Sequence, residues 1–350
     1  MNSHLQLKRL VYGEWNLPLA FLNGKVSTSH KALVQLLPDF RIEALIQRQK
    51  LIGQLKQCDT ILRFSDPDTN AIHPYINTLG ADTGRCTSSN PNLQNIEKKS
   101  SLRKLFKSRP GHKLIVFDFS QIEPRALAHF VGEGAFRELF SSDQDFYTRL
   151  ATEVFSNEST NAPVRDIAKQ VVLGVMYGLG AKRMATNLGV SLAEAQGFIS
   201  KFFKRYPEIE LFKKRTIKTT CLTGFAEGLM GRRRYIDAIS SEDEYERYQA
   251  ERQAINAVIQ GSATTLFKYK LVQIRRALPL SVKFLLHVHD EVILEAPEEQ
   301  AERLFVQIKR VLEDPVSWFA IPLQVDGGIG STWTEAKKSE NRKEEPNGNN

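Results

Sequence analysis

Two runs of apolar and β-branched residues, each carrying carboxylates at an end, dominate the hydrophobic pattern of this chain. They are KLIVFDFSQIEPR at residues 113–125 and KFLLHVHDEVILEA at residues 283–296. Such runs predict buried strands. Because the carboxylates stand where the strands emerge, we expect Asp118, Asp290 and Glu291 to meet in space. Aspartates from separate strands commonly hold paired Mg²⁺ ions in phosphoryl transfer, since magnesium prefers oxygen ligands.

The periodicity of the N-terminal residues 1–70 predicts helices, followed by a turn-rich break at residues 65–70. Within residues 40–57 the apolar side chains lie broadly on one stripe, which predicts a packing helix. The stripe consists of Ile42, Leu45, Ile46, Leu51, Ile52 and Leu55.

Helical and turn patterns also organise the second half of the chain. Residues 145–204 alternate helix-forming segments with loops at 157–163 and 178–180. Residues 224–236 predict a hairpin, and the charged stretch 240–278 predicts a long helix. The polar, apolar-poor residues 337–350 predict a disordered tail.

Composition narrows the class of protein. With 350 residues and 41% hydrophobic content, the chain can bury a sizeable core in two or three subdomains. Its net charge of +8 favours phosphate-rich partners. The three cysteines are far apart, which favours a reducing compartment. Since no apolar run is long enough to span a bilayer and the N-terminus lacks a secretory signal, we expect an intracellular protein and no membrane partner.

One predicted helix carries cations and an aromatic residue on one side. Arg165, Lys169, Leu173 and Tyr177 recur every four residues, so they drift slowly around the helix. Two cations followed by apolar and aromatic surface suit a nucleotide, with charge against the triphosphate and surface against sugar and base. The alternative is a solvated basic turn followed by core positions.

A second helical triplet consists of Arg252, Asn256 and Gln260, again at intervals of four. Guanidinium and amide groups along one face can donate to base edges in the minor groove. An exposed polar helix face has the same spacing, so the pattern alone leaves both interpretations open.

The loop TGRCTSSNPNLQNI at residues 83–96 is rich in amides and hydroxyls, which can follow a phosphate backbone. Neighbouring basic residues extend this electrostatic pattern, although charge runs are often only solvated surface. They are Lys98, Lys99, Arg103, Lys104, Lys107, Arg232, Arg233 and Arg234.

The acidic motifs also have an ordinary explanation. Asp290 in an HDE sequence can serve turn chemistry, and Asp118 can cap a helix. His289 need not be a ligand, because a lone histidine near carboxylates is more often a hydrogen-bond partner.

Taken together, the five motifs resemble the polymerase domain of family A DNA polymerases over residues 27–336. TGRCTSSNPNLQNI is similar to the template-primer loop, DFSQIEPRALAH to motif A and RDIAKQVVLGVMYG to the fingers helix of motif B. GRRRY with ERQAINAVIQG resembles the palm and its minor-groove helix, and HVHDE resembles motif C.

The resemblance implies an α+β right-hand fold with an antiparallel-sheet palm, helical fingers and a truncated thumb. The implied divisions are a residual thumb or N-terminal helical segment at 1–70, palm at 71–140, fingers at 141–222, palm again at 223–336 and the tail at 337–350.

It also implies roles for single residues. Asp118 and Asp290 would hold two Mg²⁺ ions, or Mn²⁺ in their place, with the main-chain carbonyl of Phe119 as a further ligand. Glu291 would be an accessory catalytic carboxylate near the primer end. Lys169 would clamp the triphosphate together with Arg165 and protonate pyrophosphate.

The remaining implied roles concern nucleotide and DNA. Glu123 would block a ribose 2′-hydroxyl, Gln121 would support the site, and Tyr177 would stack near the templating base. The implied template and primer contacts are Arg85, Asn92, Gln94, Asn95, Arg252, Asn256, Gln260 and His289.

Four positions depart from the family pattern. Leu173 stands where Phe or Tyr is usual, so the surface for the nucleotide sugar is aliphatic. Tyr147 stands where a phosphate-contacting histidine is common, Pro124 replaces leucine, and Glu97 replaces proline.

The expected function is DNA-directed DNA synthesis on primed DNA with deoxynucleoside triphosphates. Because the segment before residue 27 is too short for a full thumb or exonuclease domain, we expect no proofreading and no 5′-nuclease, and an accessory protein that supplies thumb or processivity. The expected location is the cytoplasm or nucleoid for a bacterial or phage protein, and the nucleus or an organelle for a eukaryotic one.

Two other readings stay open. A truncated fold that binds primer-template DNA with weak catalysis would show salt-dependent binding and background incorporation. A relative of single-subunit RNA polymerases would accept ribonucleotides, against which Glu123 argues.

Overall fold

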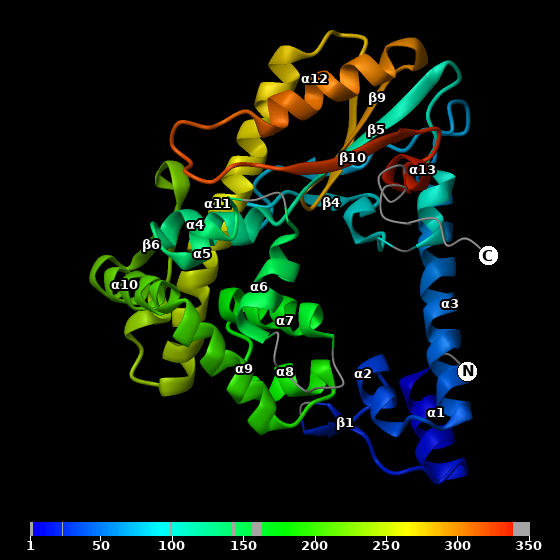
Figure 1. Cartoon of the computed structure of the whole chain (residues 1–350). Coiled ribbons are helices and arrows are strands. Elements are labelled where there is room, and N and C mark those ends of the chain that lie inside the picture. Colours follow the sequence, from blue (N-terminus) through cyan, green and yellow to red (C-terminus); the bar gives the residue numbers. More distant parts are fainter. Residues whose placement is uncertain (1–2, 23, 99, 142–143, 156–162, 339–350) are drawn as a thin grey trace, which may run out of the picture. The chain divides into compact units, whose positions relative to one another are not determined.

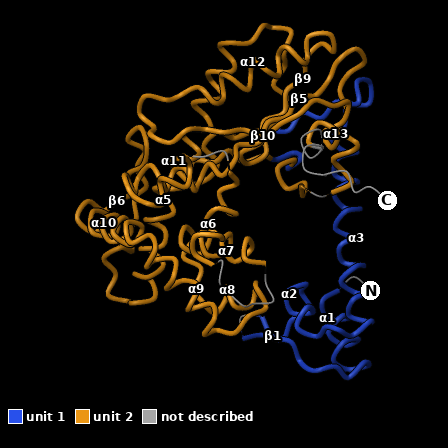
Figure 2. The backbone as a smooth tube through the Cα atoms, in the orientation of Figure 1, with its two compact units in different colours: residues 1–75, 89–92 blue, residues 76–88, 93–350 orange. Residues whose placement is uncertain are grey.

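The chain folds into two compact units (Figure 2). Unit 1 comprises Met1–Tyr75 and Ser89–Asn92, and unit 2 comprises Ile76–Ser88 and Leu93–Asn350. Both acidic motifs lie in unit 2, so this unit carries the candidate site. The computed structural model describes residues 3–22, 24–98, 100–141, 144–155 and 163–338.

Unit 1 is mainly helical, as the sequence predicts. Its strands β1 and β2 add a short antiparallel hairpin that the pattern did not predict. The elements are α1 (His4–Lys8), a π-helix (Arg9–Glu14), β1 (Phe21–Leu22), β2 (Lys25–Val26), α2 (His30–Leu33), a 3₁₀-helix (Val34–Leu36) and α3 (Phe40–Arg63).

The apolar stripe of α3 is buried only in its first two turns. Ile42 and Leu45 belong to the core of unit 1, whereas Leu51 and Leu55 are 59% and 62% exposed. The predicted packing stripe is therefore wrong at Leu51 and Leu55. In the described part of the chain, that core reaches α3 no further than Ile46.

A four-stranded antiparallel sheet in unit 2 carries both acidic motifs (Figure 1). Its strands run in the order β10 (Val325–Gly330), β5 (His112–Phe119), β9 (Glu291–Pro297) and β8 (Lys283–Val288). The first apolar run forms β5 as predicted.

The second apolar run forms two strands rather than one. His289 and Asp290 make the turn between β8 and β9, and His289 takes a left-handed φ of 56° there. The register places Glu291 directly opposite Asp118 on β5.

Two helices contact opposite faces of this sheet, because successive side chains of a strand point to opposite sides. Phe117 of β5 stacks on Phe305 of α12 (Ala301–Glu313), with ring centroids 4.7 Å apart. Asp118, the next residue, contacts Lys337 of α13 (Trp333–Lys338). Helix α13, which follows β10, thus reaches the face of the sheet to which the Asp118 side chain points. Figure 1 shows α13 beside this sheet.

The remaining helices of unit 2 enclose an apolar core in which rings pack edge to face, as Phe136 does with Phe146, Phe202 and Tyr206. They are α4 (Ile122–Val131), α5 (Ala135–Glu138), α6 (Phe146–Phe155), α7 (Val164–Tyr177), α8 (Ala181–Leu188), α9 (Leu192–Arg205), α10 (Pro207–Thr223) and α11 (Glu244–Ala277).

Several local predictions are confirmed. β6 (Phe225–Glu227) and β7 (Arg233–Tyr235) form the predicted hairpin, and α11 is the predicted long helix. The remaining short strands are β3 (Tyr75–Asn77) and β4 (Thr87–Ser89). No described helix combines the length and apolarity needed to cross a membrane.

The predicted tail begins too early. Lys337 and Lys338 belong to α13, because Trp333 of the same helix is buried and anchors it to the fold. Residues 339–350, the remainder of that prediction, lie outside the described residues.

Candidate active site

The structure brings Asp118 and Asp290 onto adjoining backbone. Asp118 is the penultimate residue of β5, and Asp290 lies in the turn before β9. The backbone nitrogen of Phe119 donates to the carbonyl of Asp290 at 3.1 Å. The expectation that the two acidic motifs meet is confirmed at the level of the backbone, and the role of these carboxylates as metal ligands stays a prediction.

The two aspartates have opposite electrostatic environments. Burial, together with the negative charges of Glu123 and Asp118, raises the pKa of Asp290 to about 7. Burial also acts to raise the pKa of Asp118, but the ammonium groups of Lys337 and Lys98 outweigh it and lower that pKa. A cation beside Asp290 would therefore relieve a repulsion that the surrounding carboxylates create.

The donor chemistry fits a hard divalent cation. Mg²⁺ is commonly held by one or two carboxylates, with water and substrate phosphate completing its six ligands. Asp118, Asp290 and the nearby carbonyl of Phe119 offer oxygen donors of this kind. Within the described ranges no cluster of three or more His, Cys, Asp or Glu side chains is suited to a metal ion, so these residues do not form an all-protein cage.

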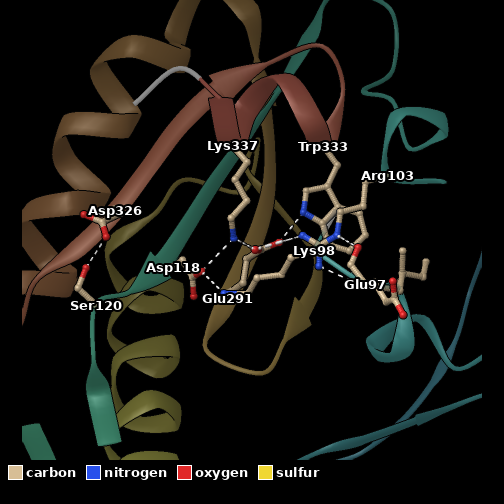
Figure 3. A network of polar contacts seen from close by, with 10 residues as sticks. Glu97, Lys98, Arg103, Asp118, Ser120, Glu291, Asp326, Trp333 and Lys337 are labelled. Atoms are coloured by element: carbon tan, nitrogen blue, oxygen red, sulfur yellow. Dashed lines mark hydrogen bonds and ion pairs between the residues drawn. The ribbon is translucent and has the colours of Figure 1, made fainter. Parts of the chain in front are cut away.

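Glu291 lies at the centre of a buried polar network (Figure 3). It is 1% exposed, and Arg103 Nη1 donates to its two carboxylate oxygens at 3.0 and 3.3 Å. Trp333 Nε1 and Lys337 Nζ also donate to it. The Arg103 guanidinium stacks over the Trp333 ring at 3.9 Å. Charges this deeply buried require partners, and Glu291 has them.

Asp118 receives two ammonium groups from different parts of the chain. Lys98 Nζ and Lys337 Nζ each donate to its Oδ2 atom at 2.9 Å. By pattern alone, Lys98 belongs to a basic run and Lys337 to the predicted tail. The spacing of Trp333 and Lys337, four residues apart, was the available signal for a short helix with one inward face.

A second cluster surrounds Glu123, which is buried in the first turn of α4. Arg85 Nη2 donates to one carboxylate oxygen at 2.5 Å, and the Tyr177 hydroxyl donates to the other. Burial and the charge of Glu123 raise the pKa of Tyr177, which therefore stays protonated as a donor. Gln121 precedes α4 with a left-handed φ of 51°, where the chain turns from strand to helix.

The predicted stripe of α7 is present, with Arg165 and Lys169 exposed and Leu173 packed against the core of unit 2. Arg165 contacts Asp145 at 3.1 and 3.2 Å, and its guanidinium lies 5.7 Å from the Tyr147 ring. Burial and the charges of Glu123 and Asp145 raise the pKa of Tyr147 to about 12. The stripe thus has exposed cations at its start and apolar positions against the core further along, an arrangement that both interpretations of the pattern share.

The triplet on α11 is not a solvated face. Gln260 is buried and hydrogen-bonds the side chain of Tyr177, and Arg252 Nη2 donates to the Tyr177 carbonyl at 2.8 Å. In the described part of the chain, Arg252 Nε and Asn256 Oδ1 are buried without a hydrogen-bond partner. Unmet polar atoms of this kind suit a face that receives a ligand.

The loop that contains Arg85 is held in place by a lysine that lies outside the predicted motifs. Lys268 Nζ of α11 donates to the carbonyls of Thr78 and Gly84, at 2.5 and 2.7 Å. Gln94 Nε2 donates to the His287 carbonyl at 3.3 Å.

A small pocket beside this loop adjoins Asp290 and His289. It is also lined by Arg85, Cys86, Gln94, Thr264, Phe267, Lys268 and His287. Asn95 lies in a short 3₁₀-helix (Leu93–Asn95), and Asn92 belongs to unit 1. The contacts of both residues with template or primer stay predictions.

Comparison with solved structures identifies the class of fold. The POL domain of Pol1 from M. smegmatis, solved in complex with DNA primer-template and dNTP, matches with a TM-score of 0.86 and 28% sequence identity. The match covers 96% of this chain and 61% of that chain. The mixed helix and sheet fold is thus that of a polymerase domain.

The chain belongs to DNA polymerase family A, whose sequence profile matches residues 1–335. The thermostable DNA polymerase I of Thermus filiformis is 36% identical over 97% of this chain and 42% of its own length. DNA polymerase I of Bacillus caldotenax is 35% identical over 96% of this chain and 40% of its own length. The chain therefore spans about two fifths of these curated relatives.

Proposed function

We propose that this chain carries out DNA-directed DNA synthesis, in which a primer 3′-hydroxyl attacks the α-phosphate of a deoxynucleoside triphosphate and pyrophosphate leaves. The observation that carries the proposal is the meeting of two separate motifs, in which Asp118 near the end of β5 lies beside Asp290 in the turn before β9. Primer-template DNA and dNTP, which accompany the M. smegmatis POL domain, are the proposed partners.

Asp118, Asp290 and the Phe119 carbonyl are proposed to hold two Mg²⁺ ions. Such ions, when bound, stabilise the attacking and leaving oxygens of a phosphoryl transfer. The carboxylates of Glu123 and Asp118 favour positive charge beside Asp290. Glu291 acts as an accessory carboxylate whose ion pairs with Arg103 and Lys337 fix its orientation.

The exposed cations of α7 are proposed to bind the triphosphate. Arg165 exchanges its contact with Asp145 for phosphate oxygens, and Lys169 donates to them and protonates pyrophosphate. Tyr147, which stays protonated, donates a hydrogen bond to phosphate.

Selection of the sugar is proposed to depend on Glu123, supported by Gln121. Arg85 and Tyr177 hold the Glu123 carboxylate in one orientation, so a ribose 2′-hydroxyl meets a fixed obstacle. Leu173 supplies an aliphatic contact to the sugar, and Tyr177 stacks near the templating base.

The proposed DNA contacts form two groups. Arg252, Asn256 and Gln260 present polar groups from α11 to the minor groove. Arg85, Asn92, Gln94, Asn95 and His289 contact the template or primer backbone. In this proposal residues 71–140 and 223–336 form the palm, 141–222 the fingers and 1–70 a residual thumb.

A primer-extension assay with Mg²⁺ tests the proposal, using Asp118→Ala and Asp290→Ala. Loss of about 4 kcal/mol of metal-dependent stabilisation lowers incorporation by about a thousandfold. Glu302→Ala, which removes an exposed carboxylate of α12, is the matched control and should retain full activity.

Two outcomes would contradict the proposal. One is a folded parent chain that binds primed DNA but incorporates nothing, which would favour a DNA-binding module. The other is undiminished incorporation by Asp118→Ala.

A further inference from the structure

Helix α13 places the side chains of Trp333 and Lys337 against the carboxylate of Glu291 (Figure 3). Trp333 is 1% exposed, and its backbone nitrogen donates to the Phe106 carbonyl at 3.0 Å. Its ring meets Phe106 edge to face at 5.6 Å. Glu335 Oε2 accepts hydrogen bonds from the backbone nitrogens of Ser331 and Thr332, at 3.0 and 3.2 Å. The helix is therefore fixed at its N-terminal end.

One turn further along, Lys337 reaches the two carboxylates that face each other across β5 and β9. Its ammonium donates to Asp118 Oδ2 at 2.9 Å and also to Glu291 Oε2. In the part of the chain that the structure describes, Lys98 pairs with Asp118 and Arg103 with Glu291, whereas Lys337 pairs with both carboxylates.

The Lys337 ammonium reduces the repulsion between the two carboxylates that it bridges. Like charges directly opposite each other on neighbouring strands repel, and Asp118 and Glu291 are such a pair. Glu291 is held in place by its buried contacts with Arg103 and Trp333. Because the Lys337 ammonium binds Glu291 and Asp118 together, it also restrains the orientation of the Asp118 carboxylate. The side chain of Lys98 is 63% exposed, compared with 31% for Lys337, so Lys98 is the less restrained of the two partners.

We propose that Lys337 is a positioning residue for DNA synthesis, which orients the Asp118 carboxylate by tying it to the buried Glu291. This inference rests on the proposed function, in which Asp118 is the residue that holds metal. Lys337 itself contacts neither nucleotide nor DNA in this scheme.

The test compares Lys337→Met, which keeps the apolar length of the side chain without its charge, with Lys337→Arg, which keeps the charge. Lys214→Met is the matched control, because Lys214 is 71% exposed and pairs with Glu210 on α10. Two quantities are measured: the steady-state kcat and KM for dNTP at saturating Mg²⁺, and the binding of Mn²⁺ alone to the protein, followed by electron paramagnetic resonance.

For Lys337→Met we expect kcat to fall at least about tenfold with KM for dNTP within about twofold, since a misplaced carboxylate affects the reacting geometry. Mn²⁺ should bind at least about threefold more tightly, because a positive charge beside Asp118 is gone. Lys337→Arg and Lys214→Met should stay within about twofold of the parent chain in both quantities.

These opposite changes separate positioning from a purely structural role. An unchanged kcat for Lys337→Met would overturn the inference, and so would a joint loss of kcat, Mn²⁺ affinity and thermal stability. A parent chain that extends no primer would refute the proposed function instead, and the Mn²⁺ titration would still report whether the Lys337 ammonium acts on Asp118.

Discussion

At the scale of single residues, the contacts of Glu123 explain how a flexible side chain is held in one orientation. A glutamate in the first turn of a helix normally samples several rotamers in water. Here the side chain is buried, with a guanidinium from Arg85 on one oxygen and the Tyr177 hydroxyl on the other. Each partner comes from a different part of unit 2, so this orientation depends on the assembled fold.

Replacing Glu123 with alanine should relax the choice of sugar. The ratio of ribonucleotide to deoxynucleotide incorporation, measured as kcat/KM for each, should rise by about ten- to a hundredfold, because the obstacle to a 2′-hydroxyl is removed. Glu133→Ala, at an exposed carboxylate just beyond the same helix, should leave the ratio unchanged. An unchanged ratio in Glu123→Ala would contradict the assignment and reopen kinship with RNA polymerases.

At the scale of elements, hydrogen bonds between side chains and nearby backbone can fix where a helix begins. Helix α9 starts with a capping box, in which Ser191 Oγ accepts from the Glu194 backbone nitrogen at 3.2 Å. Glu194 Oε2 in turn accepts from the Ser191 backbone nitrogen at 2.8 Å. The buried face of α9 carries Phe198 and Phe202 into the core of unit 2. The cap therefore sets the start of a helix whose packing stabilises that core.

The substitution Ser191→Ala should lower the free energy of unfolding by about 1 kcal/mol, since a backbone donor at the helix start loses its acceptor. Urea denaturation followed by circular dichroism measures this change. Ser200→Ala, at an exposed position inside α9, is the control and should be neutral or slightly stabilising. Equal effects of the two substitutions would show that the cap contributes nothing.

At the scale of the whole molecule, the net charge favours the proposed binding of DNA. The net charge is +8, and within unit 2 the cations Arg165, Lys169 and Lys98 are exposed. A surface of this kind binds a polyanion mainly by releasing counterions from the phosphates.

The affinity for primed duplex DNA should therefore fall steeply with salt. Neutralising about four phosphates gives a slope of about −3.6 in a plot of log affinity against log salt concentration, which is a loss of about a hundredfold for a fourfold rise in salt. Fluorescence anisotropy with a labelled primer-template measures the slope. Lys169→Met should reduce its magnitude little in the absence of nucleotide, because that cation is assigned to the triphosphate. A slope near zero would contradict binding through phosphates.

Predictions from local pattern were correct where neighbouring residues alone determine structure. The strand β5, the hairpin of β6 and β7 and the long helix α11 follow from apolar periodicity and turn residues. The stripe of α3 shows the limit of that approach. Leu51 and Leu55 have the periodicity of buried residues, but burial requires a partner surface, and periodicity carries no information about one.

The sequence by itself determined the family, the order of the motifs and the residue types available for chemistry, because each motif is short and is read from adjacent residues. Only the tertiary structure decided which charges meet. Lys337 lies 219 residues from Asp118, and Arg103 lies 188 residues from Glu291. Such pairs form when strands and helices pack. Packing removes water from the charged groups, and a charge without water is costly unless an opposite charge lies beside it. A linear pattern records neither the packing nor the loss of water, so these contacts were visible only in the folded chain.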